Sequence, residues 1–117
     1  MQALKFKIMN TLRNKVQLIG NLGNDPEIIN LESGKTLAKF SIATNESYKN
    51  AKGEKITDTQ WHNVVAWGKT AQIIEKYVTK GKEVAIEGKL TSRSYETKEG
   101  EKRYITEVVC NELMMLG

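Results

Sequence analysis

Four aromatic side chains in this sequence stand where a flat ligand could stack on them. Trp61 and Trp67 are six residues apart in a segment rich in β-formers, so in a strand both would point to one face. Tyr48 and Tyr95 lie in polar surroundings that are hard to explain as core. A basic residue lies within two positions of three of them: Lys49, Lys69 and Arg93. Aromatic faces with nearby cations are typical of single-stranded nucleic-acid sites, although the two tryptophans could equally be core.

Catalytic and metal-binding residues are scarce. His62 is the only histidine, and a lone histidine in a strand is more often a hydrogen-bonded structural residue than a general base. Cys110 is the only cysteine, so no Cys/His cluster has metal-ligand spacing. Its apolar neighbours predict a small buried hydrophobe. The segment 20–23 lacks the Lys-Ser/Thr pair and the following helix of a phosphate loop. We expect a protein that is not an enzyme and needs no metal or cofactor.

Length and composition predict a single domain. The chain has 117 residues, 39% hydrophobic and 27% charged, with a formal net charge of +4 that suits an anionic partner without proving one. No apolar stretch approaches the roughly 18 residues that span a bilayer, and the N-terminus lacks a secretory signal. One cysteine fits a reducing compartment, so we expect a cytoplasmic protein without a membrane partner. We place the domain at residues 10–117 and interpret residues 1–9 as an N-terminal extension or a cloning remnant.

Apolar and polar residues alternate along most of the chain, which predicts strands. Strands are expected over 14–22, 27–31, 37–45, 59–67, 83–90 with a polar extension over 91–98, and 103–109. Apolar residues recur at helical spacing over 70–77, so a helix is expected there, with Thr70 as its N-cap and Gly81 after its end. The polar segment 46–58 is predicted to be a long hairpin loop.

The order of these elements favours a small closed barrel. Gly20 and Gly88 interrupt two strands, where glycine indicates a bend or a close backbone approach. A barrel removes sheet edges, and one short helix can cover its end. The prediction is a mainly all-β fold, a five-stranded antiparallel OB-fold barrel with one short helix between strands three and four. Phe40 and Tyr77 are expected in its core. A small α+β sandwich is the alternative.

Ordered segments across the chain carry a family resemblance. They are NKV at 14–16, IGNLGNDPE at 19–27, FSIATNESY at 40–48, TQWHNVVAWGK at 59–69, YVTKG at 77–81, VAIEGKL at 84–90 and RYITEVV at 103–109. Each motif is moderately specific, and their order and spacing together are highly specific. Through them the chain resembles the bacterial single-stranded DNA-binding protein (SSB) family over residues 10–117.

The resemblance implies an OB-fold that assembles as a homotetramer and binds single-stranded DNA, tolerant of sequence, in replication, recombination and repair. It implies base stacking on Tyr48, Trp61, Trp67 and Tyr95. The family commonly has Trp at the first and last of these positions and Phe at the third. It implies phosphate contacts at Lys15, Lys69, Lys80, Arg93 and Arg103. It also implies a position near a subunit interface for His62.

Three questions stay open at this point. Family members usually continue into a flexible tail with an acidic, Phe-ended tip that recruits replication and repair enzymes, whereas this chain ends at residue 117. Recruitment of those enzymes is therefore not predicted. An OB-fold protein–protein adaptor, such as a primosome component, is the alternative function, although an adaptor would not need aromatic residues paired with cations. Stacking does not sense the 2′-hydroxyl, so the residues alone do not separate DNA from RNA.

Overall fold

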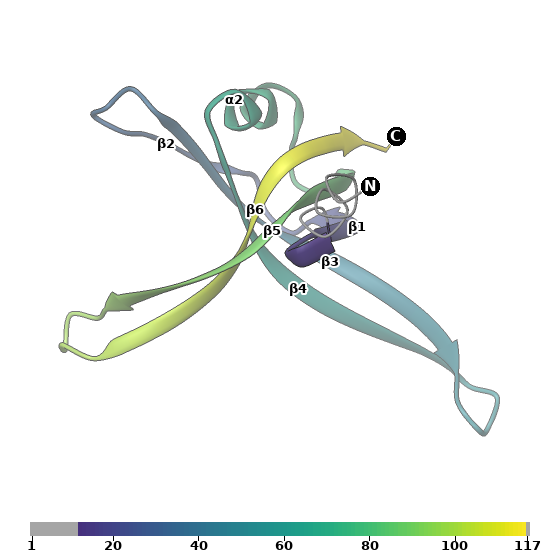
Figure 1. Ribbon diagram of the computed structural model, residues 1–117. Coiled ribbons are helices and arrows are strands. Elements are labelled where there is room, and N and C mark those ends of the chain that lie inside the picture. The colour runs from purple at the N-terminus through teal and green to yellow at the C-terminus, as the bar shows by residue number, and fades with distance from the viewer. Residues whose placement is uncertain (1–11, 117) are drawn as a thin grey trace, which may run out of the picture.

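The computed structural model describes residues 12–116, which form a closed β-barrel with one short helix (Figure 1). The elements are β1 (Val16–Leu22), β2 (Glu27–Asn30), β3 (Thr36–Lys49), β4 (Lys55–Trp67), α2 (Gly68–Tyr77), β5 (Glu83–Glu96) and β6 (Lys102–Met115). The strand order is β1-β5-β6-β4-β3-β2, and pairing of β1 with β3 closes the barrel. Because β2 pairs only with β3, five strands make up the barrel, and the predicted OB-fold with its helix between the third and fourth barrel strands is confirmed. The predicted boundary between residues 9 and 10 lies outside the described residues.

One strand pairing differs from the antiparallel prediction. β4 and β6 run parallel, with Val64 opposite Val108 and Val65 opposite Val109. The direction follows from the other pairings: β4 is antiparallel to β3, β6 is antiparallel to β5, and both β3 and β5 are antiparallel to β1. β4 and β6 therefore both point the same way as β1.

Two glycines allow the strands to approach closely, as predicted. An ideal Cβ on Gly20 would lie 2.6 Å from Cγ2 of Ile42. One on Gly88 would lie 2.8 Å from the carbonyl carbon of Val109, beside the register shift between Glu87 and Gly88. Any side chain at either position would force the strands apart, so the barrel closes only because both residues are glycine.

The predicted long loop over 46–58 is wrong, because β3 and β4 stay paired as a two-stranded ribbon. Their register is continuous from Leu37 opposite Trp67 to Lys49 opposite Lys55, and only residues 50–54 form the turn. Oδ1 of Asn50 accepts hydrogen bonds from the backbone N–H groups of residues 52 and 54 and so closes that turn. β5 and β6 form a second projecting ribbon (Figure 1). A ribbon in solvent has no core face, so its sequence lacks the alternation that identifies a strand.

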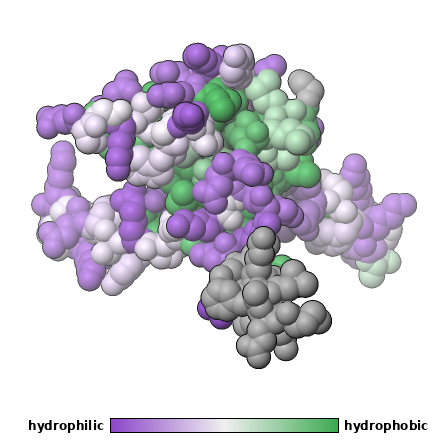
Figure 2. All heavy atoms as spheres, turned by 45° about the horizontal axis from the view of Figure 1, so that its top comes forward, coloured by the Kyte–Doolittle hydropathy of each residue, from purple (hydrophilic) through white to green (hydrophobic). Residues whose placement is uncertain are grey.

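The core lies between the barrel wall and α2. Its fully buried side chains of largest volume are Ile42, Val64, Ile74, Val78 and Val84. Figure 2 shows hydrophobic surface gathered on the body of the molecule, whereas the projecting parts are mostly hydrophilic. No helix in the part of the chain that the structure describes is both long and apolar enough to cross a membrane.

Predictions for the aromatic core residues and for the helix ends had mixed outcomes. Phe40 is buried as expected, but Tyr77 is 60% exposed, because Ile74 and Val78 occupy the inward-facing stripe. Thr70 is not the N-cap: α2 begins at Gly68, directly after β4, without a side-chain capping hydrogen bond. The helix ends at Tyr77, and Gly81, with φ of +87°, lies in the following turn.

Cys110 is a small buried hydrophobe, as its neighbours predicted. It is 3% exposed, and its thiol donates a hydrogen bond to the carbonyl oxygen of Glu112 over 3.2 Å. Burial raises the pKa of the thiol to about 11. The group is therefore held in its unreactive, protonated form at neutral pH.

Candidate nucleic-acid interface

The outward face of β4 presents both tryptophans to solvent. The unbroken register between β3 and β4 shows that no bulge separates them, so Trp61 and Trp67 point to the same side. Trp61 is 62% exposed and Trp67 is 45% exposed, whereas Val64 and Ala66, on the opposite face, are buried. The two tryptophans are therefore a surface feature, and the alternative that they form the core is wrong.

Trp61 rests on a glycine in the loop between β1 and β2. An ideal Cβ on Gly23 would lie 2.9 Å from Cη2 of the Trp61 ring and closer still to Cζ3. Oδ1 of Asn24 accepts hydrogen bonds from the backbone N–H and the Oγ–H of Ser41, at 3.1 and 2.8 Å. The backbone N–H of Gly23 donates to the carbonyl oxygen of Ser41. The loop is thereby fixed to β3 directly beneath the indole, which leaves the outer side of the ring open.

Two adjoining hollows of about 310 and 440 Å³ connect the faces of β4 and β5. Both are lined by Lys39, Val65, Arg93 and Glu107, and Trp67 lines the larger one. The hollows are shallow and carry an aromatic wall and two cations. Such a surface suits an extended ligand with flat groups and negative charge.

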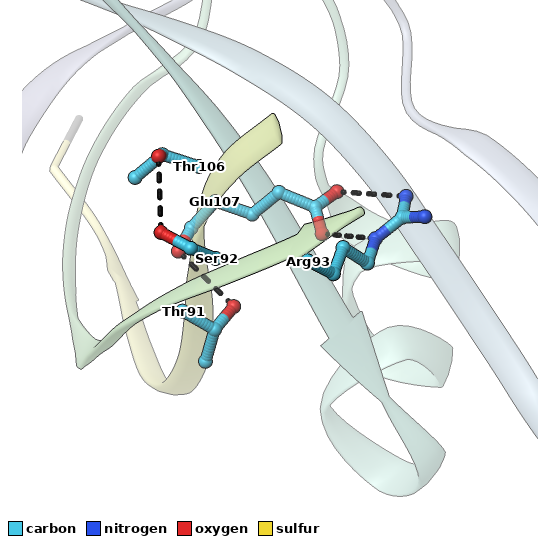
Figure 3. A network of polar contacts seen from close by, with 5 residues as sticks. All are labelled: Thr91, Ser92, Arg93, Thr106 and Glu107. Carbon is cyan, nitrogen blue, oxygen red and sulfur yellow. Dashed lines mark hydrogen bonds and ion pairs between the residues drawn. The ribbon is translucent and has the colours of Figure 1, made fainter. Parts of the chain in front are cut away.

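The arginine in these hollows is held by a buried carboxylate (Figure 3). Nε of Arg93 lies 2.8 Å from Oε1 of Glu107, and Nη2 lies 3.5 Å from Oε2. Glu107 is 6% exposed. The hydrogen bond to Glu107 holds the pKa of Arg93 above its ordinary value. The same carboxylate orients the guanidinium and neutralises it, so an anionic ligand must compete with Glu107 for Arg93.

Tyr95 continues the same face of the β5–β6 ribbon. It is two residues from Arg93, directly opposite Arg103, and 44% exposed. Nη2 of Arg103 lies 3.1 Å from Oε2 of Glu101, so this second arginine also has a carboxylate partner. The alternation along β5 places Tyr95 on the side of the ribbon that lines the hollows.

Tyr48 lies on the other face of the β3–β4 ribbon from Trp61. It is 57% exposed and pairs with Ile56, whereas Trp61 pairs with Ala43. Five positions separate Ala43 from Tyr48 on β3, so their side chains point to opposite sides. A single strand that touches both Trp61 and Tyr48 must therefore pass around the ribbon.

The three other cations implied by the resemblance lie at different places. Nζ of Lys15 is 2.8 Å from Oε1 of Glu87, in a separate hollow on the flank where β1 pairs with β5. Lys69 is exposed in the first turn of α2, two residues after Trp67. Lys80 is exposed in the turn after the helix, and its backbone N–H donates to Oδ1 of Asp25. Only Lys69 follows directly on the tryptophan face.

His62 is half-buried on the inward-facing side of β4, and Nε2 lies 3.0 Å from Oγ1 of Thr44. That contact agrees with a hydrogen-bonded structural residue. Its predicted position at a subunit interface stays a prediction. Within residues 12–116, no three histidine, cysteine or carboxylate side chains are grouped as metal ligands.

Sequence reasoning missed three residues of this surface: Gly23, Lys39 and Glu107. The contact of Gly23 with Trp61 joins residues far apart in the chain, so no local pattern indicates it. Lys39 lies in the alternating strand over 37–45, but nothing in the sequence places it beside Arg93. Glu107 had a visible signal, because it is the acidic residue that adjoins the apolar run at 108–110. A charged residue in such a position is often paired when buried.

The chain matches a family described as "Single-strand binding protein family" over residues 13–116. It is 49% identical to "Single-stranded DNA-binding protein 1" of Chlorobaculum tepidum over 105 residues, which cover 89% of this chain and 65% of that protein. It is 41% identical to "Single-stranded DNA-binding protein" of Neisseria meningitidis serogroup A over 104 residues, which cover 89% of this chain and 60% of the relative. The chain thus spans less than two thirds of the length of these two relatives.

A solved structure shares the fold. The structure titled "Plasmodium falciparum SSB complex with ssDNA" superimposes with a TM-score of 0.78 at 35% sequence identity, covering 89% of this chain and 95% of that one. Because nearly all of that chain is covered, the similarity extends over the barrel and is not confined to one motif.

Proposed function

The chain belongs to the single-strand binding protein family, and we propose that it binds single-stranded DNA with little regard to sequence. The observation that carries the proposal is the exposed aromatic face: Trp61 is 62% and Trp67 is 45% open to solvent, beside hollows lined by Lys39 and Arg93. Every base has a π-face, so stacking on these rings tolerates any sequence and contributes about 1–3 kcal/mol per base. The solved relative, named as a complex with ssDNA, supports the same ligand.

The strand stacks on Trp61 and Trp67 and reaches Tyr95 across the hollows, and it contacts Tyr48 by passing around the β3–β4 ribbon. Lys69 and Lys80 serve as phosphate contacts. Lys15, Arg93 and Arg103 contribute less to the salt dependence, because each has a carboxylate within ion-pair distance. The protein acts without catalysis, in the cytoplasm, where it protects single strands during replication, recombination and repair.

Self-association as a homotetramer is part of the proposal. A hollow of about 650 Å³ lies on the β1–β5–β6 surface, lined in part by Ile19, Leu113 and Met114. Ile19 is 61% and Met114 is 65% exposed, and exposed apolar side chains grouped in this way mark interaction surfaces. Covering this surface and the neighbourhood of His62 with other copies of the chain would remove apolar area from water.

The test compares binding and stability in one variant. Trp61→Ala should weaken binding of a fluorescently labelled oligo-dT, measured by anisotropy, roughly 5- to 150-fold, which corresponds to about 1–3 kcal/mol. Its melting temperature should change little, because the ring is largely exposed. Mass measured in solution, with and without oligo-dT, reports the oligomer. A large loss of melting temperature with unchanged affinity would contradict the proposal, as would wild-type protein that leaves the anisotropy unchanged at low salt.

A further inference from the structure

Two lysines face each other at the end of the β3–β4 ribbon. Lys49 and Lys55 are partners on the last rung of the ladder, and both are exposed. Like charges directly opposite each other on neighbouring strands are destabilising. Among residues 12–116, no carboxylate lies within ion-pair distance of either lysine. The folded chain therefore keeps together two positive charges that repel each other and are not neutralised.

The lysine pair shares a ribbon face with Trp61. Partners on a rung share a face, and alternate rungs point the same way, so the rungs of Trp61 and of the two lysines lie on one side. Two rungs of hydrogen-bonded polar side chains lie between them: Asn45 with Thr59 at 2.6 Å, and Ser47 with Thr57 at 3.2 Å. This face is thus uncharged next to Trp61 and cationic at the tip.

The opposite face of the ribbon carries the negative charge. Glu46 and Asp58 are partners on one rung of that face, next to the rung of Tyr48 and Ile56. The charges of the ribbon strands are therefore sorted by face, with both carboxylates away from Trp61. The ribbon projects from the barrel, so its two faces are both open to a long ligand (Figure 1).

We propose that Lys49 and Lys55 form a phosphate-binding site that extends the path of the single strand from Trp61 to the tip of the ribbon. The proposal rests on the proposed function. A phosphate between the two ammonium groups removes the repulsion between them. Phosphate binding at Arg93 must first break its ion pair with Glu107, whereas the two lysines have no ion pair to break. Six residues separate Trp61 from Lys55, which is about 20 Å along a strand. At about 3.4 Å per phosphate this distance spans roughly six nucleotides or fewer.

The experiment measures the salt dependence of oligo-dT binding. Each neutralised single-strand phosphate contributes about 0.7 to the slope of log affinity against log salt, so Lys49→Gln with Lys55→Gln, which removes one phosphate site, should lower the slope by about 0.7. The loss of affinity in this double variant, relative to wild type, should then be about 2.6-fold smaller at roughly 200 mM salt than at 50 mM. The probe is a labelled oligo-dT of about 16 nucleotides, the upper end of OB-fold site sizes. The melting temperature should stay unchanged or rise, because a repulsive pair is removed.

The matched control is Lys35→Gln with Lys76→Gln, which removes the same charge from a turn and from α2. The control should leave the slope near the wild-type value. An unchanged slope in the Lys49/Lys55 variant would overturn the inference, and so would an equal fall in the control, which would attribute the effect to net charge. In either case, binding by wild-type protein and its loss in Trp61→Ala would leave the proposed function standing.

Discussion

Gly23→Ala should weaken DNA binding because the new methyl group displaces the indole ring of Trp61. The new methyl group would lie 2.9 Å from Cη2 of Trp61 and closer to Cζ3, so the indole must move off the β1–β2 loop. The loop itself has little freedom to yield, because Asn24 and the backbone of Gly23 bind it to Ser41. Trp61 is 62% exposed, so the ring can swing toward solvent.

The magnitudes decide which effect dominates. A methyl group forced into a closed site costs about 1–3 kcal/mol, but here the obstructing group is a surface side chain that can rotate away. We therefore expect a loss of stability below about 1 kcal/mol. If the displaced ring no longer stacks on a base, binding loses about 1–3 kcal/mol, which is roughly 5- to 150-fold in affinity. Affinity should thus fall far more than stability.

A double-mutant cycle separates this mechanism from general damage. Affinity for labelled oligo-dT is measured by anisotropy, and melting temperature in parallel, for wild type, Gly23→Ala, Trp61→Ala and the double variant. Because Gly23 acts through Trp61, the double variant should bind no worse than Trp61→Ala alone. Losses that add in the double variant would refute the reasoning, as would unchanged affinity in Gly23→Ala.

Three further predictions concern ionisable groups. Glu107→Gln should lower the melting temperature but strengthen oligo-dT binding, because Arg93 loses its competing carboxylate. The slope of log affinity against log salt should become steeper by about 0.7. Weaker binding would contradict this prediction and would mean that Arg93 needs Glu107 to orient it. Burial raises the pKa of the Cys110 thiol to about 11 from 9.0. At pH 7 this thiol should therefore react with a thiol reagent at least about a hundredfold more slowly than an exposed cysteine. A rapid reaction would contradict its burial. The pKa of Glu87 is lowered, chiefly by Lys15, so this ion pair stabilises the fold above the ordinary value of 4.5 and is lost as the pH falls through the lowered pKa. The melting temperature of Glu87→Gln should accordingly lie below that of wild type at pH 7 and approach it in acid, whereas a gap independent of pH would exclude this origin.

The barrel was predictable because its strands have one buried and one exposed face. Residues 37–45 alternate between apolar and polar, residues 59–67 are rich in β-formers, and the glycines at 20 and 88 indicated where strands come close. The ribbon over 46–58 was not predictable in this way, because both of its faces meet solvent and no hydrophobic period marks it. Its pairing follows from the register of the barrel strands, which continues outward without interruption.

The candidate site was predictable in its residue types more than in its geometry. The alternation of side chains along a strand correctly placed Trp61 and Trp67 on one face. Alternation alone does not show which of the two faces is buried in the core. Small buried residues such as Val64 and Ala66 occupy the inner face and leave the indoles outside. The pairing of Arg93 with Glu107 depends on the β5–β6 register, and the opposition of Tyr48 and Trp61 depends on that of β3 and β4. Such relations between strands do not appear in any local pattern.

The most direct test of the central claim reads each tryptophan separately. Trp67→Phe leaves Trp61 as the only tryptophan, and Trp61→Phe leaves Trp67. Each variant is titrated with oligo-dT at low salt and micromolar concentration while its emission is recorded. Stacking on the outward face of β4 predicts that DNA quenches the emission of both variants and that added salt restores it. Emission that stays unchanged in both variants as DNA is added would contradict the account.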